Sequence, residues 1–267
     1  MADLSTRNFF QGPQAPWSRW RRLAAPSLFF LAVIYYEELF LKLYCFHTIS
    51  LAGFFFTLLF SIPLALILGL LCGGTPHRLG SALLVLCTAL LSLWMGSQTV
   101  YYHLFKTFLT LFSLTKMAMV AGAFGDMAVG EILLNWFPIL MMSIPVVLAL
   151  LLRTKLCPQQ PLLSQARLRW AALALLVQLL SMGLVLLCGN GVLSLRYIYF
   201  QAAAPILEVQ NFGMMTETQL EIRRVLFGIE PVDQILPKHD VRQTGPILKS
   251  ETALGESEPA VHTLEID

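Results

Sequence analysis

Three charged residues interrupt the first apolar run of this sequence. Glu37, Glu38 and Lys42 all lie inside residues 28–46, which are otherwise almost entirely apolar. Glu38 and Lys42 are four residues apart with the acid first, so a helix places them on one face, whereas Glu37 lies about 100° around it. Charges at that depth cost at least ~2.5 kcal/mol each, so we expect all three to face the interior of a helix bundle. Two interpretations stay open: a satisfied internal ion pair, or a site that touches lipid head groups or a catalytic partner.

A second candidate group follows the third apolar run, in the stretch LLSLWMGSQTVYYHLFKTFLTLFSL at residues 90–114. Tyr101, Tyr102, His103 and Lys106 stand together there. Aromatic and lysine residues at the end of an apolar run are typical of the place where a helix leaves the bilayer. His103 and Lys106 are suited to binding the phosphate of a lipid head group. The alternative is that the cluster only anchors the helix at the interface.

A third candidate group lies in the tail, where Arg223 and Arg224 form a basic pair within LEIRRVLF. Residues 216–219, TETQ, fit a capping box with Thr216 as the N-cap. Gly228 fits a stop signal at the other end. The sequence therefore predicts a short helix between them, and we count its two arginines among the candidate lipid-binding residues.

Motifs for catalysis or metal binding are missing from the sequence. It contains no HExxH, no Walker loop and no DxxD pair. The five cysteines show no CxxC spacing, and four of them sit in or beside apolar runs, where a free cysteine behaves as a small hydrophobe. We predict no catalytic residue, no metal site and no cofactor in this chain, and the net charge of only +2 gives no reason to expect a nucleic-acid partner.

The composition indicates the elements that must hold these residues. Hydrophobic residues make up 57% of the 267 residues and charged residues 13%, whereas soluble domains have roughly 45–50% and about 25%. We predict an all-α membrane protein with five transmembrane helices, interfacial helices and a short extracellular tail. The expected spans are residues 28–46, 51–72, 79–100, 132–152 and 170–188, each about as long as the hydrocarbon core requires. In the second span, Gly69 and Gly73 form a GxxxG, which allows close helix contact.

The segments outside the spans divide by composition. Residues 1–27 form a basic arm, which we expect in the cytoplasm; a cleaved signal peptide is the weaker alternative because no suitable cleavage site follows. Residues 105–131 predict interfacial or re-entrant helices, with a plain loop as the alternative. We expect residues 189–230 to be an extracellular juxtamembrane linker helix. Residues 231–267 are polar, acidic and poor in aromatics, which predicts disorder.

Charge in the loops predicts the orientation. With the N-terminus inside, the arm and the two loops on that side carry nine lysines and arginines, namely Arg7, Arg19, Arg21, Arg22, Arg78, Arg153, Lys155, Arg167 and Arg169. The opposite side carries Lys106 and Lys116 before the fifth span. Because basic loops stay in the cytoplasm, we expect a multi-pass cell-membrane protein with a cytoplasmic N-terminus and an extracellular C-terminus.

These residues resemble the membrane region of the lipoteichoic acid synthase and sulfatase-like family of Gram-positive cell envelopes. The third-span passage is similar to that family's "YY-x-x-F-x-x-F-L-T" segment; its recognisable core here is Tyr101, Tyr102, Phe105, Lys106, Phe108, Leu109 and Thr110. NFGMMTETQLEIRRVLFG resembles the linker that follows the family's fifth span, and YYEEL at 35–39 is a further likeness. Together these passages cover most of residues 28–230.

The resemblance implies a partner as well as a fold. In that family an extracellular domain of the alkaline phosphatase type follows the linker, binds a divalent metal, and transfers glycerol-phosphate or a related group from a lipid. No such domain is recognisable in this sequence, so none of the family's catalytic residues can be assigned. We expect a truncated, split or remnant module that anchors or presents membrane lipid to an extracellular catalytic domain encoded downstream, without activity of its own. The alternative is a stand-alone multi-span protein, either a transporter or an interaction partner.

Overall fold

The structure is a computed structural model that describes residues 16–110, 130, 133–157, 164–189, 191, 194–202 and 204–227, with side chains from residue 23 onward. These residues belong to one compact unit, Met1–Ile229, and a second unit, Glu230–Asp267, lies outside the description. Several predictions therefore fall outside the described residues: most of the basic arm, the interfacial helices at 111–129, the stop at Gly228 and the acidic tail.

Five helices are long and apolar enough to cross a membrane. They are α1 (Pro16–Phe46), α2 (Leu51–Gly73), α3 (His77–Phe105), α5 (Trp136–Leu156) and α6 (Ser164–Leu186). Three shorter helices follow in the tail: α7 (Leu195–Phe200), α8 (Pro205–Phe212) and α9 (Met214–Phe227). The described residues contain no strand. The prediction of an all-α membrane protein with five spans is confirmed, and the tail segment expected to hold one linker helix holds three short ones.

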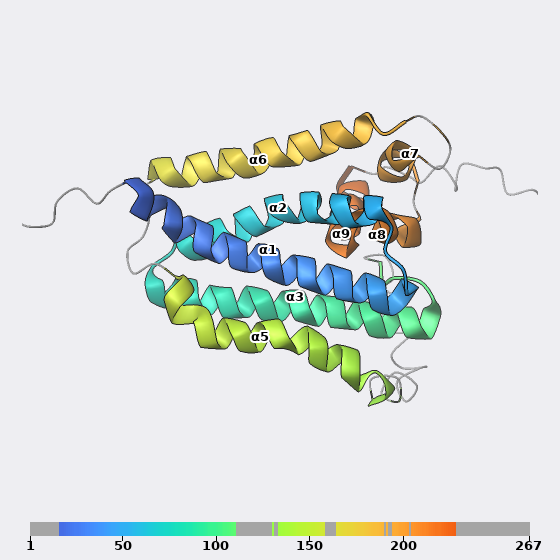
Figure 1. The fold of residues 1–267 in the computed structure, drawn as a ribbon, viewed down its shortest axis with the longest axis horizontal. Helices are drawn as coiled ribbons and strands as arrows, with labels where there is room; N and C mark the ends of the chain where they lie inside the picture. The colour runs from blue at the N-terminus through green and yellow to red at the C-terminus, as the bar shows by residue number, and fades with distance from the viewer. Residues whose placement is uncertain are drawn as a thin grey trace, which may run out of the picture. The chain divides into compact units, whose positions relative to one another are not determined.

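The five long helices lie side by side in the order α6, α2, α1, α3, α5 (Figure 1). Helix α1 is central and packs against α2 and α3, while α2 also contacts α6 and α3 contacts α5. The short helices α7, α8 and α9 gather at the end of the bundle where α1 ends and α2 begins, which we call the tail end (Figure 1). Helix α8 packs on α2, and α9 packs on α8 and α2.

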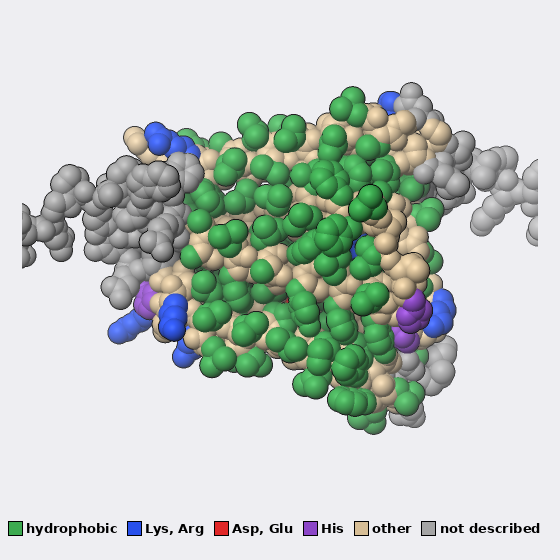
Figure 2. All heavy atoms as spheres, in the orientation of Figure 1, with side chains coloured by type: hydrophobic (Ala, Val, Ile, Leu, Met, Phe, Trp, Pro, Cys, Tyr) green, Lys and Arg blue, Asp and Glu red, His purple; other side chains and the backbone are tan. Residues whose placement is uncertain are grey.

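The outer faces of the bundle are apolar, as contact with lipid tails requires. Leucines on the two outermost helices point outward, including Leu151 on α5 at 69% exposure and Leu180 on α6 at 65%. Figure 2 shows hydrophobic side chains covering the middle of the visible face and basic side chains at its two ends. This distribution matches a belt of lipid between two polar surfaces.

Helices α1 and α2 approach each other closely at Gly69. A Cβ atom added there would lie 2.7 Å from the Ser27 Cα on α1, so only hydrogen fits. The Ser27 hydroxyl accepts a hydrogen bond from the indole of Trp170 on α6 at 3.3 Å. This crossing therefore joins three spans, and the first glycine of the GxxxG is the one that makes it possible.

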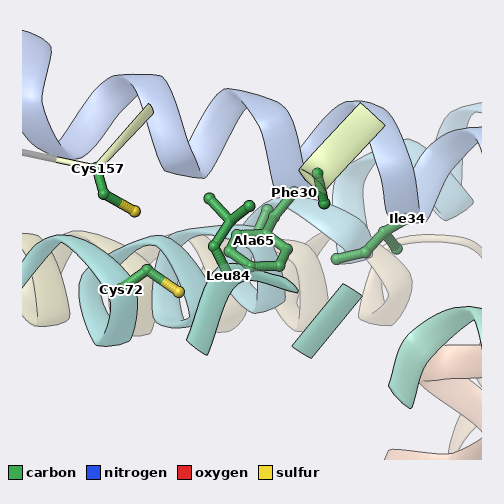
Figure 3. Close-up of a cluster of buried hydrophobic side chains, with 7 residues drawn as sticks. Phe30, Ile34, Ala65, Cys72, Leu84 and Cys157 are labelled. Carbon is green, nitrogen blue, oxygen red and sulfur yellow. The ribbon is translucent and has the colours of Figure 1, made fainter. Parts of the chain in front are cut away.

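The interior of the bundle contains a cluster of apolar side chains from four helices. Phe30 and Ile34 from α1 pack with Ala65 of α2 and Leu84 of α3, and Cys72 and Cys157 point into the same cluster (Figure 3). All five cysteines are free thiols. Here the cysteines fill space like small hydrophobes.

We predict that Gly69→Ala weakens the bundle, since the new methyl group must displace Ser27. Overpacking of this kind costs about 1–3 kcal/mol, which should appear as a lower melting temperature of the protein in detergent. Gly183→Ala on α6 is the matched control, because nothing lies within 4 Å of its added Cβ. Equal melting temperatures for the two variants would contradict the close crossing.

Candidate functional site

The three charged residues in the membrane-spanning part of α1 lie in the interior, as the cost of placing charge in lipid predicts. Glu37, Glu38 and Lys42 are each at most 1% exposed. Glu38 and Lys42 face the tail end of the bundle and meet α2, α8 and α9, whereas Glu37 faces α3. We call the contacts of α8 and α9 with α1 and α2 the tail junction.

Glu38 caps the N-terminus of α9. Its two carboxylate oxygens accept hydrogen bonds from the backbone N–H groups of Met214 and Met215, each at 2.7 Å. The first N–H groups of a helix lack partners within it and carry partial positive charge, so a carboxylate there is doubly favourable. Gly213 stands immediately before the helix with a φ of 97°, and a Cβ on it would lie 2.7 Å from Glu38 Oε2. Glycine is required there both for its backbone angle and for the space it leaves.

The capping box predicted within the tail is therefore wrong. Helix α9 begins at Met214, two residues before Thr216, and the Thr216 hydroxyl donates back to the carbonyl of Phe212 at 3.0 Å. The cap comes instead from Glu38, 176 residues earlier in the chain.

Lys42 completes the tail junction from one helix turn further along α1. Its ammonium donates to the carbonyl oxygens of Gly53 on α2 and Gln210 on α8, both at 3.2 Å, and to the hydroxyl of Thr57. The opposite charges of Glu38 and Lys42 also attract each other. The pair is thus satisfied internally, but mainly through hydrogen bonds to three other helices. One acid and one base on α1 hold α2, α8 and α9 together.

Glu37 stands apart from this network. Its Oε1 accepts a hydrogen bond from the hydroxyl of Ser92 on α3 at 2.5 Å, and its Oε2 has no hydrogen-bond partner among the described residues. A half-satisfied carboxyl group in a low-dielectric interior is costly. This is the only polar side chain of the three that is aimed between α1 and α3.

Arg224 is engaged within the tail. Its guanidinium forms an ion pair with both oxygens of Glu208 on α8 and donates to the carbonyl of Ala202 at 2.7 Å. Burial raises the pKa of Glu208, and the hydrogen bond and charge of Arg224 oppose that rise. Arg223 lies over the rings of Tyr199 and Phe200, at 5.6 and 5.9 Å from their centroids, and thereby contacts α7. The two predicted lipid-binding arginines therefore hold α7, α8 and α9 to one another.

The aromatic group at the end of α3 also makes internal contacts. Tyr102 stacks on Phe108, and Tyr101 packs against Phe105. His103 Nδ1 lies 3.0 Å from the carbonyl of Thr99, and its ring packs on Tyr44 of α1. Lys106 ends α3 in the left-handed conformation with its side chain exposed and its ammonium 5.9 Å from the Tyr102 ring centroid. Of these four, Lys106 is the residue best placed to reach a ligand outside the protein.

The chain just beyond Lys106 folds back onto α3. The buried amide of Gln98 donates to the carbonyl of Leu109 at 3.0 Å and accepts from its N–H at 2.9 Å. This two-bond contact buries Phe108 and Leu109, which the aromatic pattern alone suggested as interfacial. Sequence reasoning missed Gln98; the one available signal was an amide side chain inside an apolar run.

The structure does not unite the two predicted lipid-binding groups. Among the residues that are described, no hydrogen bond, ion pair or ring contact joins Tyr101, Tyr102, His103 or Lys106 to Arg223 or Arg224. Nor does the described part of the chain contain three histidine, cysteine, aspartate or glutamate side chains placed to hold a metal ion. The arrangement can hold a tail segment firmly and offer one exposed cation beside aromatic rings.

Comparison with known families accounts for the membrane bundle. A family model described as "Lipoteichoic acid synthase N-terminal domain" matches residues 14–196, so the chain belongs to that family. The matched range contains all five long helices, Glu38 and Lys42, and it ends before α8 and α9. No curated protein and no solved structure matches.

We predict that Lys42→Met destabilises the protein by about 3 kcal/mol, because removing one partner leaves the buried Glu38 without its countercharge. Thermal unfolding in detergent would measure this change. The double variant Glu38→Gln/Lys42→Met should recover part of the loss, since no uncompensated charge then remains.

Lys106→Met serves as the matched control for Lys42→Met, because the side chain of Lys106 is exposed. If both single variants melt at the same temperature, the tail junction does not depend on the buried ammonium.

Proposed function

We propose that this member of the lipoteichoic acid synthase N-terminal domain family is a membrane anchor that holds an extracellular catalytic domain close to its lipid substrate. The observation that supports it best is the cap that Glu38 gives to α9. A segment fixed to a transmembrane helix by two hydrogen bonds keeps a defined orientation. The start of α9 is thereby held at a defined place relative to the transmembrane helices.

The partner in this proposal is a sulfatase-like domain of the alkaline phosphatase superfamily, encoded downstream or on a separate chain, with its own divalent metal. In the proposed orientation, the end of the bundle where α2 ends and α3 begins faces the cytoplasm, because basic residues are enriched on that side of a membrane. The basic residues at that end are Arg78 on α3, Arg153 and Lys155 on α5, and Arg167 and Arg169 on α6. Because α1 crosses once between that side and the tail end, the tail helices then lie outside the cell. An extracellular catalytic domain would have to be anchored on this side of the membrane.

Lipid presentation is the second part of the proposal and rests on Lys106. Its exposed ammonium stands at the end of α3, beside the aromatic residues Tyr101 and Tyr102. A cation at a membrane interface attracts the phosphate of an anionic glycerophospholipid, while the rings pack against its glycerol and upper acyl carbons. Arg223 and Arg224 play no direct part, since their guanidinium groups are engaged within the tail.

The alternative function is that of a stand-alone transporter, and one observation favours it. Glu37 is a buried carboxyl group in a span, and one of its oxygens has no hydrogen-bond partner among the described residues. Ionisable groups at such depth often mark transport pathways. Proton or ion flux through liposomes containing the protein, abolished by Glu37→Gln, would support this function. Absence of any flux would argue against transport and in favour of the anchoring function.

We predict that Lys106→Ala reduces contact with anionic lipid at the end of α3. The full chain would be placed in bilayer discs of phosphatidylcholine containing a photoactivatable phosphatidylglycerol, and labelled peptides would be identified by mass spectrometry. Labelling near residues 101–110 should fall several-fold in the variant, because its attraction for the phosphate is lost. Lys155→Ala, at the opposite end of the bundle, is the matched control and should keep wild-type labelling there.

The proposal that this protein anchors a catalytic domain needs a separate test. Sequencing the DNA downstream of the codon for Asp267 would reveal whether a sulfatase-like domain is encoded in or near the same frame. With that domain present, His103→Ala and Lys106→Ala together should lower group transfer from lipid. Unchanged transfer would reject lipid presentation and leave anchoring alone.

A further inference from the structure

Glu217 is a buried carboxyl group in the first turn of α9. It is 1% exposed, and neither of its oxygens has a partner among the described residues. A charged carboxylate in this position would lose its hydration without compensation. Membership of the family gives no reason for it, since α9 lies beyond the matched residues.

The neighbours of Glu217 are mostly acids, and they come from three helices. Glu38 faces it from α1, Glu208 from α8, and Glu221 from the next turn of α9. Arg224 is the one base among these neighbours, and its guanidinium is already bound to Glu208 and to the carbonyl of Ala202.

The charges that act on Glu217 come from α1, α8 and α9, and none of them comes from α2 or α7. Helix α2 packs against α8 and α9, but Leu51–Gly73 contains no acidic, basic or histidine residue. Helix α7 contacts α8 and carries Arg196, which is not among the charges that act on Glu217, and Tyr199, whose ring lies against Arg223. An ionised Glu217 would therefore add a negative charge beside three carboxyl groups. The nearby positive charges are already engaged, that of Lys42 with Glu38 and that of Arg224 with Glu208.

We propose that Glu217 is a proton-binding site that controls the attachment of α9 to the membrane bundle. With the proton bound, the side chain is neutral and the N-terminus of α9 stays hydrogen-bonded to Glu38. Loss of the proton places a second carboxylate near the one that caps the helix, and repulsion between the two loosens the tail junction. The device belongs to the junction itself and operates whatever the junction carries.

The electrostatics support this control and give its direction. Burial raises the pKa of Glu217 to about 8, chiefly by desolvation, and the charges of Glu221, Glu208 and Glu38 add to the rise while Arg224 opposes it. The usual value is 4.5. Because the folded protein holds this proton more tightly than the unfolded chain, the stabilisation is complete below pH 4.5 and is lost as the pH rises through about 8. The junction should therefore be firm in mildly acidic surroundings and weaken in alkaline ones.

Hydrogen–deuterium exchange of the full chain in bilayer discs tests the proposal. Protection of the α9 amides, corrected for intrinsic exchange, should fall about tenfold between pH 7 and pH 9, in proportion to the protonated fraction of a group with a pKa near 8. The amides of α3 serve as an internal reference and should not follow this profile. Glu217→Gln should keep α9 protected at both pH values.

Two further variants make the result decisive. Glu217→Met replaces the carboxyl group by an apolar one of similar length, so it tests the same loss of pH dependence should the buried amide of Gln prevent folding. Glu221→Gln removes a neighbouring negative charge and should shift the loss of protection to lower pH, because Glu217 then ionises more easily.

Three outcomes would overturn the proposal. The first is a pH profile of α9 that is the same in the wild type and in both Glu217 variants. The second is a Glu221→Gln profile that moves to higher pH. The third is a wild-type α9 that regains its protection at pH 9 on addition of Na⁺ or Ca²⁺, which would show that Glu217 binds a metal cation in place of a proton.

Discussion

The cost of a charge inside an apolar bundle governs the part of this protein that lies beyond its spans. Glu38 and Lys42 are both buried within α1, where neither water nor lipid can solvate them. Their hydrogen-bonding capacity is met by the start of α9, by a carbonyl on α8 and by groups on α2. Removing the tail helices would take from Glu38 both of its backbone hydrogen-bond donors and from Lys42 the carbonyl of Gln210. The position of the tail and the presence of charge in the first span are thus two aspects of one arrangement.

The same solution recurs where other segments leave the spans. Gln98, buried in α3, holds the chain at Leu109 through two hydrogen bonds, and the ion pair between Arg224 and Glu208 joins α8 to α9. In each case a polar side chain inside the fold satisfies backbone or charged groups of a neighbouring segment. Hydrogen bonds sheltered from water are directional and hold geometry well. These hydrogen bonds hold the segments that leave the spans in defined positions. A membrane anchor for another domain requires this property.

The match to the lipoteichoic acid synthase N-terminal domain family covers the five-helix bundle but does not include α9, the helix that Glu38 caps. The matched range ends at residue 196, whereas the helix that Glu38 caps begins at Met214. The tail junction therefore combines residues of the family domain with residues beyond it. Glu217 makes that junction dependent on pH, because it is a carboxyl group near the cap with no hydrogen bond to any residue in the described part of the chain. The residues that Glu38 caps, Met214 and Met215, and the proposed proton-binding residue Glu217 all lie within the first turn of α9.

The sequence by itself determined the five spans and the inward orientation of Glu37, Glu38 and Lys42. Apolar length and the cost of burying charge are local properties, and both can be evaluated along the chain without knowing which helices meet. The exposed position of Lys106 also follows from the end of an apolar run. By contrast, Arg223 and Arg224 looked suited to lipid in the sequence, and the fold engages them with Glu208, Tyr199 and Phe200.

Only the tertiary structure decided which partners the buried polar groups have. The TETQ pattern at 216–219 satisfied every local rule for a helix start, yet α9 begins two residues earlier because Glu38 offers its backbone a stronger acceptor. A carboxylate 176 residues away leaves no trace in a local pattern. Gly213 illustrates the same limit, since its need for a positive φ and for open space arises from Glu38 alone. Spans follow from how each segment meets lipid, whereas caps and ion pairs follow from how segments meet one another.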